Sequence, residues 1–447
     1  MTPFPKNFFW GAAAASYQIE GWGRDSGIGR SVWDQFCDTP GKVFAGNDGS
    51  VACDHYHRYA DDVRMMADLG LQAYRLSISW PRVIPQGTGA VNAKGLDFYD
   101  RLVDALLAAN IRPWVTLFHW DYPLALYDRG GWLNADSPQW FADYARVVVD
   151  RLSDRVQNWF TLNEPQCSVL LGHQDGVHAP GLKLGRRDIL RINHHHMVAH
   201  GLAVQVIRSH SQSPAQIGAA PVGVIKIPRT ESPEDIAAAR AATFAVNQQG
   251  LWCTTPYTDP MVLGQYPEEL HPELPEGALD DLDTIRQPLD FFGANIYHAD
   301  LVEADGQGGW RNLEFPVGHP RTPMDWNVVP EALYWGPKFL HERYNLPVVI
   351  TENGMANPDW VDCDGHVRDG QRIDFVRRYL RNYRRAIDEG VPALGYFYWS
   401  IMDNFEWAFG YSKRFGLVHV DYQTQQRTLK DSAHWYRELI RQHGANL

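Results

Sequence analysis

Two glutamates, Glu164 and Glu352, occupy the same kind of position in the sequence. Glu164 lies in Thr161-Leu162-Asn163-Glu164-Pro165, and Glu352 lies in Ile350-Thr351-Glu352-Asn353-Gly354. In both segments an apolar run, typical of a buried strand, gives way to a loop at the carboxylate. One such glutamate is as easily a capping or solvated loop residue. Two of them at equivalent places indicate chemistry.

A pair of carboxyl groups can cleave a glycosidic bond. One donates a proton to the leaving oxygen while the other attacks the anomeric carbon, and retaining enzymes hold the two groups about 5–5.5 Å apart. At that separation two charges repel by about 3 kcal/mol at an effective dielectric of about 20, which is roughly two pKa units. One carboxyl group can therefore stay protonated near neutral pH, and the cycle needs no metal and no organic cofactor.

The rest of the chain alternates between short apolar runs and helical patterns. Strands are predicted at 8–12, 73–78, 113–119, 158–163, 217–220, 291–295, 348–352 and 394–399. Between them lie amphipathic helices, such as Tyr56–Leu69, with Asp54 as its expected N-cap and Gly70 at its C-terminal end. Ser137-Pro138 is expected as the N-cap and first residue of another helix.

Alternating strands and helices predict a parallel sheet. The sequence has no G-x-G-x-x-G after a strand and no P-loop, as an open nucleotide-binding sheet often has. Eight strand–helix units in 447 residues, with no linker between them, favour an α/β fold in which residues 1–447 form a single (β/α)8 TIM barrel. Its active site would lie at the C-terminal ends of the strands, where Glu164 and Glu352 are placed.

Composition excludes several other functions. Lys and Arg number 41 against 53 Asp and Glu, a net charge of −12 without any basic run, so neither nucleic acid nor a membrane surface is an expected partner. No apolar run approaches the ~20 residues of a membrane helix. Five scattered cysteines without a C-x-x-C pair favour a reduced, cytoplasmic setting. Phe8–Ala15 could imitate a signal peptide, but a first strand is the better interpretation.

Histidines cluster at 194–196 and 200. His196 and His200 are four residues apart on a predicted helix, a spacing that zinc can use. No H-E-x-x-H frame and no cysteine accompanies them, so we expect packing on a helix face and predict no metal site.

Longer segments of the chain resemble glycoside hydrolase family 1, from Phe4 to about Arg441. The matching segments are Gly11–Gly21, Tyr74–Arg82, Thr116–Asp121, Thr161–Pro165, Thr351–Gly354 and Trp399–Trp407. The resemblance implies a retaining β-glucosidase that removes a terminal non-reducing β-D-glucosyl residue from oligosaccharides or from aryl and alkyl glucosides. It implies that Glu164 is the acid/base and Glu352 the nucleophile. Small β-glucosides and cello-oligosaccharides such as cellobiose would be the substrates. Whether the chain forms a homo-oligomer is not decided by the sequence.

The resemblance also implies the residues around the two glutamates. Arg75 and Tyr297 would hydrogen-bond the nucleophile and keep it ionised, although an arginine inside a barrel can equally be a structural ion pair. Asn163 would donate to the sugar 2-hydroxyl. The other substrate-binding residues would be Gln18, His119, Trp120, Glu406 and Trp407 around the 3-, 4- and 6-hydroxyls, Trp399 beneath the ring and Trp326 beyond the scissile bond.

Glu406 separates the substrate classes. A carboxylate accepts two hydroxyl protons and would repel a 6-phosphate, which disfavours the alternative of a 6-phospho-β-glucosidase. Because Glu406 can reach either O4 epimer, we also expect activity on β-galactosides and β-fucosides. The thioglucosidase branch of the family carries Gln where Glu164 stands, so this alternative is disfavoured. The alternative of another class, an inactive sugar-binding barrel, would lack one of the two glutamates.

The leaving-group side departs from the family pattern. Many relatives place an Asn just after the fifth strand, where this chain reads Ala220-Pro221-Val222-Gly223. Gln166, Cys167 and Leu171 are expected to line the entrance.

Overall fold

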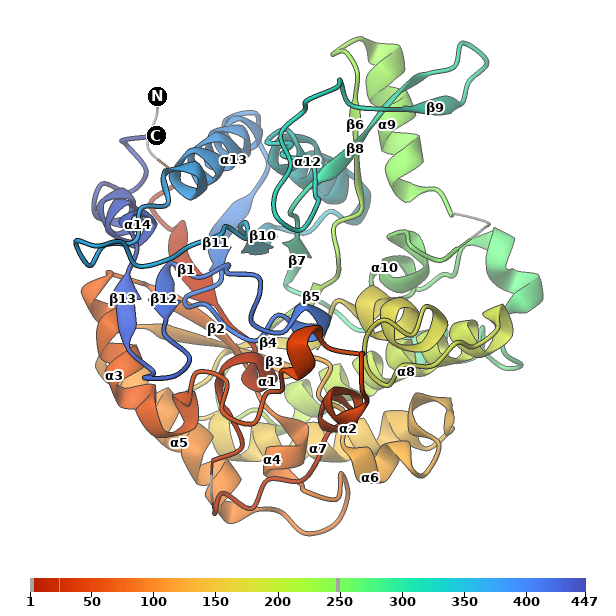
Figure 1. Cartoon of the computed structure of the whole chain (residues 1–447). Coiled ribbons are helices and arrows are strands. Elements are labelled where there is room, and N and C mark those ends of the chain that lie inside the picture. Colours follow the sequence, from red (N-terminus) through yellow and green to blue (C-terminus); the bar gives the residue numbers. More distant parts are fainter. Residues whose placement is uncertain (1–3, 24, 247–249) are drawn as a thin grey trace.

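The protein is described by a computed structural model over residues 4–23, 25–246 and 250–447. Within these residues eight parallel strands close into a barrel in sequence order, and the last strand pairs with the first (Figure 1). The barrel strands are β1 (Phe9–Ala13), β2 (Ala73–Ser77), β3 (Arg112–Phe118), β4 (Asn158–Asn163), β5 (Gln216–Ala220), β7 (Phe291–Asn295), β10 (Val348–Asn353) and β11 (Ala393–Trp399). The predicted (β/α)8 barrel is confirmed, and all eight predicted strands overlap these.

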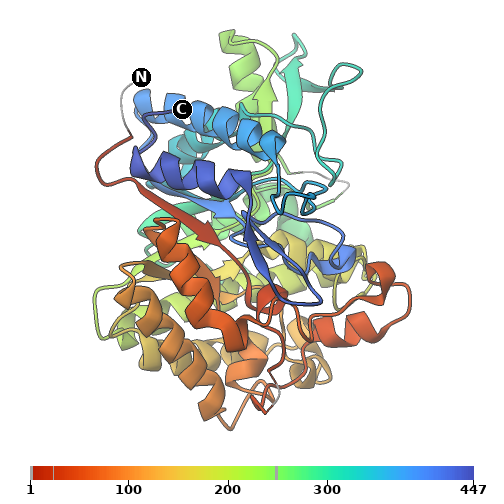
Figure 2. The same cartoon turned by 60° about the vertical axis from the view of Figure 1, so that its left-hand side comes forward.

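Helices cover the outside of the barrel. The longer ones are α3 (His55–Asp68), α5 (Ala93–Ala108), α7 (Ser137–Leu152), α8 (Arg186–His210), α12 (Ala332–Tyr344), α13 (Gly370–Asp388) and α14 (Asp431–Arg441). Each buries an apolar stripe, as α5 does with Phe98, Leu102 and Leu106. Figure 2 shows α3 and α5 on one side of β1, with α13 and α14 on the other.

Shorter elements lie in the connections. The remaining helices are α1 (Ser16–Ile19), α2 (Val32–Asp38), α4 (Trp80–Val83), α6 (Leu124–Tyr127), α9 (Pro233–Phe244), α10 (Thr255–Val262), α11 (Leu282–Ile285), the 3-10 turns η1 (Phe44–Gly46), η2 (Gly131–Leu133), η4 (Glu268–Glu273) and η5 (Trp407–Phe409), and the π-helix η3 (Cys167–Gln174). In one small sheet β8 (Ala299–Ala304) lies between β6 (Ile225–Pro228) and β9 (Trp310–Leu313), and in a second β12 (Val418–Val420) pairs with β13 (Arg427–Leu429). The first of these sheets projects from the barrel together with α9 (Figure 1).

Two predicted helix starts are wrong in detail. Asp54 precedes α3 but has a left-handed backbone (φ 50°), and its side chain binds His57 and Arg58 instead of capping the helix. Helix α7 begins at Ser137, so Ser137 is its first residue and Asp136 stands at the N-cap. Helix ends depend on local backbone angles, which sequence patterns fix only to within a residue or two.

Aromatic rings fill the lower barrel. Phe9, Trp114, Phe160, Phe291 and Phe397 are buried together inside the strands. Gly218 makes room for one of these rings, because a Cβ there would lie 2.1 Å from Phe291. The packed interior leaves open space at the C-terminal ends of the strands.

The histidines of α8 serve packing. His196 packs against Trp132 with ring centroids 4.0 Å apart, and His200 Nδ1 lies 2.6 Å from Thr161 Oγ1. Across the described ranges, no group of His, Cys, Asp and Glu could hold a metal ion. The same residues contain no helix that is long and apolar enough to cross a membrane.

Candidate active site

A pocket of about 380 Å³ opens at the C-terminal ends of the barrel strands. Glu164 follows β4 and Glu352 lies in β10, and both line this pocket although each is less than one-tenth exposed. Glu164 and Glu352, which the sequence places at equivalent strand ends, therefore belong to one site. Its geometry gives the two carboxyl groups different surroundings.

Glu352 is surrounded by donors. Arg75 Nη1, from β2, donates to Oε1 at 2.6 Å, and the Tyr297 hydroxyl donates to Oε2 at 2.6 Å. Burial raises the pKa of Glu352, while the Arg75 guanidinium and the Tyr297 hydrogen bond act in the opposite direction. A permanent cation on one oxygen and a hydroxyl on the other favour the anion, the form that can attack carbon.

Among the residues that the structure describes, Glu164 has only uncharged donors. The Cys167 thiol donates to its Oε2 at 3.3 Å, and Asn295 Nδ2 donates to its Oε1 at 3.0 Å. Burial, followed by the negative charge of Glu352, raises the pKa of Glu164 to about 8. At neutral pH Glu164 therefore keeps its proton while Glu352 is the first to ionise. Two carboxyl groups pushed apart in this way have the properties of an acid and a nucleophile.

A chain of amides fixes Asn163 between the two glutamates. Its Oδ1 accepts from Arg75 Nη2 at 2.6 Å and from Asn295 Nδ2 at 3.1 Å. Its Nδ2 therefore donates to His119 Nε2, 3.0 Å away. Burial, followed by the Arg75 charge, lowers the pKa of His119 well below its usual value, so the ring is neutral and Nδ1 carries its proton.

Three residues of this site have unusual backbones. Glu164, Trp120 and Trp407 have φ angles of 40°, 76° and 51°, in the left-handed region that disfavours large side chains. Such strain persists only where the surroundings impose it, and it concentrates at functional sites.

Most of the other predicted site residues form the pocket wall. These are His119, Trp120, Tyr297, Trp326, Trp399, Glu406 and Trp407. Arg75, Asn163 and Gln18 lie behind that wall. Gln18 is fully buried, and its Nε2 donates to Glu406 Oε2 at 3.3 Å and to the Phe405 carbonyl at 2.8 Å. The structure thus brings all twelve predicted residues together, with these three in a supporting layer.

Part of the pocket wall is apolar. Cys167 and Leu171 line it as expected, together with Val177, Val222 and Met324. Gln166 lies below the surface and is fully buried. Its side-chain amide binds both the N–H and the carbonyl of Val222, at 3.2 and 3.3 Å. In this chain Gln166 therefore fixes the segment after β5 that lacks the expected Asn.

Several pocket residues escaped the sequence prediction, among them Asn295 and Phe415. Asn295 ends β7 and contacts both Glu164 and Asn163, while Phe415 packs beside Tyr297 and Trp326. The signal for Asn295 was available, since it is a polar residue at the end of a buried strand, as Glu164 is. Phe415 lies in an irregular loop and gives no such signal.

A closed (β/α)8 barrel that ends in an aromatic pocket with two unlike glutamates defines a retaining glycosidase. The sequence matches the model of glycosyl hydrolase family 1 over residues 1–445, and the chain belongs to this family. As a member of it, the protein is a retaining glycoside hydrolase.

Similar proteins come from several bacteria. "Beta-glucosidase A" of Thermotoga maritima is 46% identical over 99% of this chain and 98% of its own length. "Bifunctional beta-D-glucosidase/beta-D-fucosidase" of Bifidobacterium breve is 44% identical over 99% of both chains. A solved structure of the Thermotoga maritima β-glucosidase with glucoimidazole has a TM-score of 0.90 and 45% identity, covering 99% of each chain. A 6-phospho-β-glucosidase and an inactive barrel are not favoured by these relatives.

Proposed function

We propose that this glycosidase is a β-glucosidase that removes terminal non-reducing β-D-glucosyl residues by double displacement, from small oligosaccharides and from aryl and alkyl glucosides. The observation that carries the proposal is the unequal hydrogen bonding of the two glutamates in one pocket. The full-length similarity to β-glucosidases supports the choice of sugar.

In the first step the Glu352 carboxylate attacks the anomeric carbon. A bond forms between that carbon and a Glu352 oxygen, while the glycosidic bond breaks and its electrons go to the leaving oxygen. Glu164 gives this oxygen its proton. Arg75 and Tyr297 hold Glu352 in place and favour its anion before the attack.

In the second step water replaces the enzyme. Once Glu352 is esterified its negative charge is gone, so the pKa of Glu164 falls and Glu164 acts as a base. Glu164 takes a proton from the water, whose oxygen bonds the anomeric carbon as the bond to Glu352 breaks. Two inversions give net retention of configuration.

The remaining residues bind the sugar. Asn163, which lies behind the pocket wall, donates to the 2-hydroxyl through its second Nδ2 hydrogen, and the neutral His119 offers its Nδ1 proton. Trp399 lies beneath the ring and Trp326 beyond the scissile bond. The other residues around the 3-, 4- and 6-hydroxyls are Trp120, Glu406 and Trp407, with Gln18 acting from behind Glu406.

Trapping the glycosyl-enzyme tests the assignment. A 2-fluoro-β-glucoside with an activated leaving group should inactivate the enzyme, because fluorine slows both steps and slows hydrolysis of the ester most. Mass spectrometry of peptides should then find one fluoroglucosyl group on Glu352. Label on another carboxylate of an active enzyme would contradict the assignment of the nucleophile.

Substrate breadth follows from Glu406. Its carboxyl lies in the pocket and can accept a hydrogen bond from an equatorial or an axial 4-hydroxyl. Nitrophenyl β-galactoside and β-fucoside should therefore be hydrolysed, with kcat/KM within about two orders of magnitude of the glucoside, the scale of one modest contact. Strict glucoside specificity across this panel would contradict the proposal. By its name, the relative from Bifidobacterium breve acts on both glucosides and fucosides.

Cellobiose degradation in the cytoplasm completes the proposal. The cytoplasmic location is supported by the scattered cysteine pattern, which suits a reducing compartment. Cell fractionation that finds the protein outside the cytoplasm would contradict the location, and failure to release glucose from cellobiose would contradict the substrate.

A further inference from the structure

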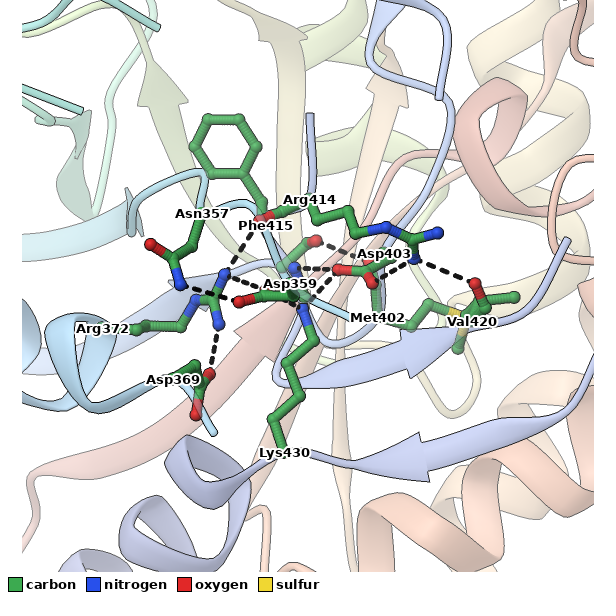
Figure 3. Close-up of polar contacts among 12 residues, drawn as sticks. Asn357, Asp359, Asp369, Arg372, Met402, Asp403, Arg414, Phe415, Val420 and Lys430 are labelled. Carbon is green, nitrogen blue, oxygen red and sulfur yellow. Dashed lines mark hydrogen bonds and ion pairs between the residues drawn. The ribbon is translucent and has the colours of Figure 1, made fainter. Parts of the chain in front are cut away.

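Six charged side chains form a buried network in which hydrogen bonds and ion pairs join them (Figure 3). Its three acids and three bases are Asp359, Asp369, Arg372, Asp403, Arg414 and Lys430. Five of the side chains are 0% exposed and Arg414 is 20% exposed. We call this group the Lys430 network. None of the six lines the active-site pocket, although Arg414 directly precedes Phe415, which does.

Lys430 stands at the centre of the network. Its Nζ donates to Asp403 Oδ1 at 2.6 Å and to Asp359 Oδ2 at 2.5 Å. Arg372 Nη2 also binds Asp359 Oδ2, at 2.6 Å, and Arg414 Nη1 binds Asp403 Oδ2, at 2.7 Å. Every charge is thus compensated at short range, as burial requires.

The network joins the loops that follow two neighbouring barrel strands. Asp359 lies in the loop after β10, the strand that carries Glu352. Asp403 lies in residues 400–417, the segment between β11 and β12, which also carries Glu406. Lys430 directly precedes α14 and ties both loops to the outer wall of the barrel. The two loops therefore share one rigid support.

Asp403 also closes the base of its own loop. Its Oδ1 accepts from the Gly416 N–H at 2.9 Å, and its N–H donates to the Val418 carbonyl at 2.9 Å. A Cβ on Gly416 would lie 2.0 Å from the Asp403 nitrogen, so the two strands of the loop base are in direct contact. Residues 404–415, including Glu406, extend from this closed base.

Glu406 has little support of its own. Among the described residues, its carboxyl accepts one long hydrogen bond, from Gln18 Nε2 at 3.3 Å. Its N–H donates to the Gly410 carbonyl, which is part of the same loop. The place of the Glu406 carboxyl in the pocket is therefore set by its loop, which Gln18 holds at Phe405 and which Asp403 closes at its base, three residues away.

We propose that Lys430, Asp403 and Asp359 are positioning residues that set how well Glu406 holds the 4- and 6-hydroxyls of the sugar. The inference rests on the proposed function of the pocket. The network contacts neither the sugar nor the two reacting glutamates, so its effect on catalysis passes through Glu406.

The test compares two substrates with one leaving group. Nitrophenyl β-glucoside has the 6-hydroxyl that Glu406 holds, and nitrophenyl β-xyloside lacks the whole hydroxymethyl group. Lys430→Met should lower kcat/KM for the glucoside about tenfold and for the xyloside about threefold, since a shift of about 1 Å can cost up to a hundredfold. The glucoside-to-xyloside ratio is the readout that general loss of stability would leave unchanged.

A second background isolates the route of the effect. In Glu406→Ala the group that the network positions is gone, so adding Lys430→Met should change kcat/KM by less than about twofold. Dinitrophenyl substrates keep these slow variants measurable. Arg414→Met removes a partly exposed partner of Asp403 and should change the substrate ratio in the same direction if Lys430→Met does not fold.

Arg343→Met is the matched control. Arg343 is 30% exposed and binds the buried Asp259, so its removal resembles that of Arg414 but lies on α12, away from the β11 loop. It should lower the melting temperature without changing the substrate ratio. An unchanged ratio in both network variants, or an undiminished effect of Lys430→Met in Glu406→Ala, overturns the inference. A wild-type enzyme inactive on both substrates would instead overturn the proposed function.

Discussion

Glu352→Ala is expected to lower kcat for nitrophenyl β-glucoside by about five orders of magnitude, the scale on which an enzyme loses its covalent nucleophile. The variant keeps the acid but has no group that can form the glycosyl-enzyme. Stability should suffer less than activity, although Arg75 loses its buried anion, because Arg75 still donates to Asn163 and to the Thr351 carbonyl. Steady-state kinetics with purified enzyme give the measurement.

Rescue by a small anion distinguishes the nucleophile from other essential residues. Azide can occupy the space vacated in Glu352→Ala and attack the anomeric carbon from the same face. The product should be α-glucosyl azide, because only one inversion occurs. Glu406→Ala also removes a pocket carboxyl and is the control, in which azide should restore nothing. A β-configured azide product from Glu352→Ala would contradict the assignment.

How far the sequence predicts this site depends on how local each signal is. Glu164 and Glu352 were found because each ends an apolar run, and barrel geometry then brings strand ends together. Asn295 obeys the same rule and was missed because an amide suggests less chemistry than a carboxyl group. Arg75 lies 277 residues from Glu352, so only the family resemblance joined them before the structure did.

The Lys430 network was beyond sequence analysis for a similar reason. Lys430 and Asp359 are 71 residues apart, and each alone has the appearance of an ordinary surface charge. Periodicity predicts which residues a helix or strand buries, but both partners lie in irregular segments. The same limit hid the left-handed backbone of Asp54, where the cap predicted from residue type does not form.

The pH dependence of the wild-type enzyme should fall off on the alkaline side as pH rises through about 8. The pKa of Glu164 is raised to about 8 by burial and by the charge of Glu352, so the proton needed for the first step persists through neutral pH and is lost above it. The limb should appear in kcat/KM, which reports the free enzyme. Glu164→Gln cannot ionise at this position, and its profile should lack the limb.

The cost of Glu164→Gln should depend on the leaving group. Alkyl glucosides need a proton on the departing oxygen and should lose about 10³-fold in kcat/KM, within the range of general acid catalysis. Dinitrophenolate leaves without a proton, so kcat/KM for its glucoside should change little while kcat falls, because the second step has lost its base. Equal losses for both substrates would contradict the role of Glu164.

Glu406→Gln is needed to assign the alkaline limb, because the pKa of Glu406 is also raised to about 8, by burial and then by the charges of Glu352 and Glu164. Gln18 donates to Glu406, and sugar hydroxyls that donate to it would lower its pKa further in the complex. Glu406 gives no proton to the leaving oxygen. Glu406→Gln should therefore lower kcat/KM for alkyl and dinitrophenyl glucosides by the same factor, and its pH profile should keep the alkaline limb. Loss of the alkaline limb in Glu406→Gln but not in Glu164→Gln would assign the titration to Glu406 instead of Glu164.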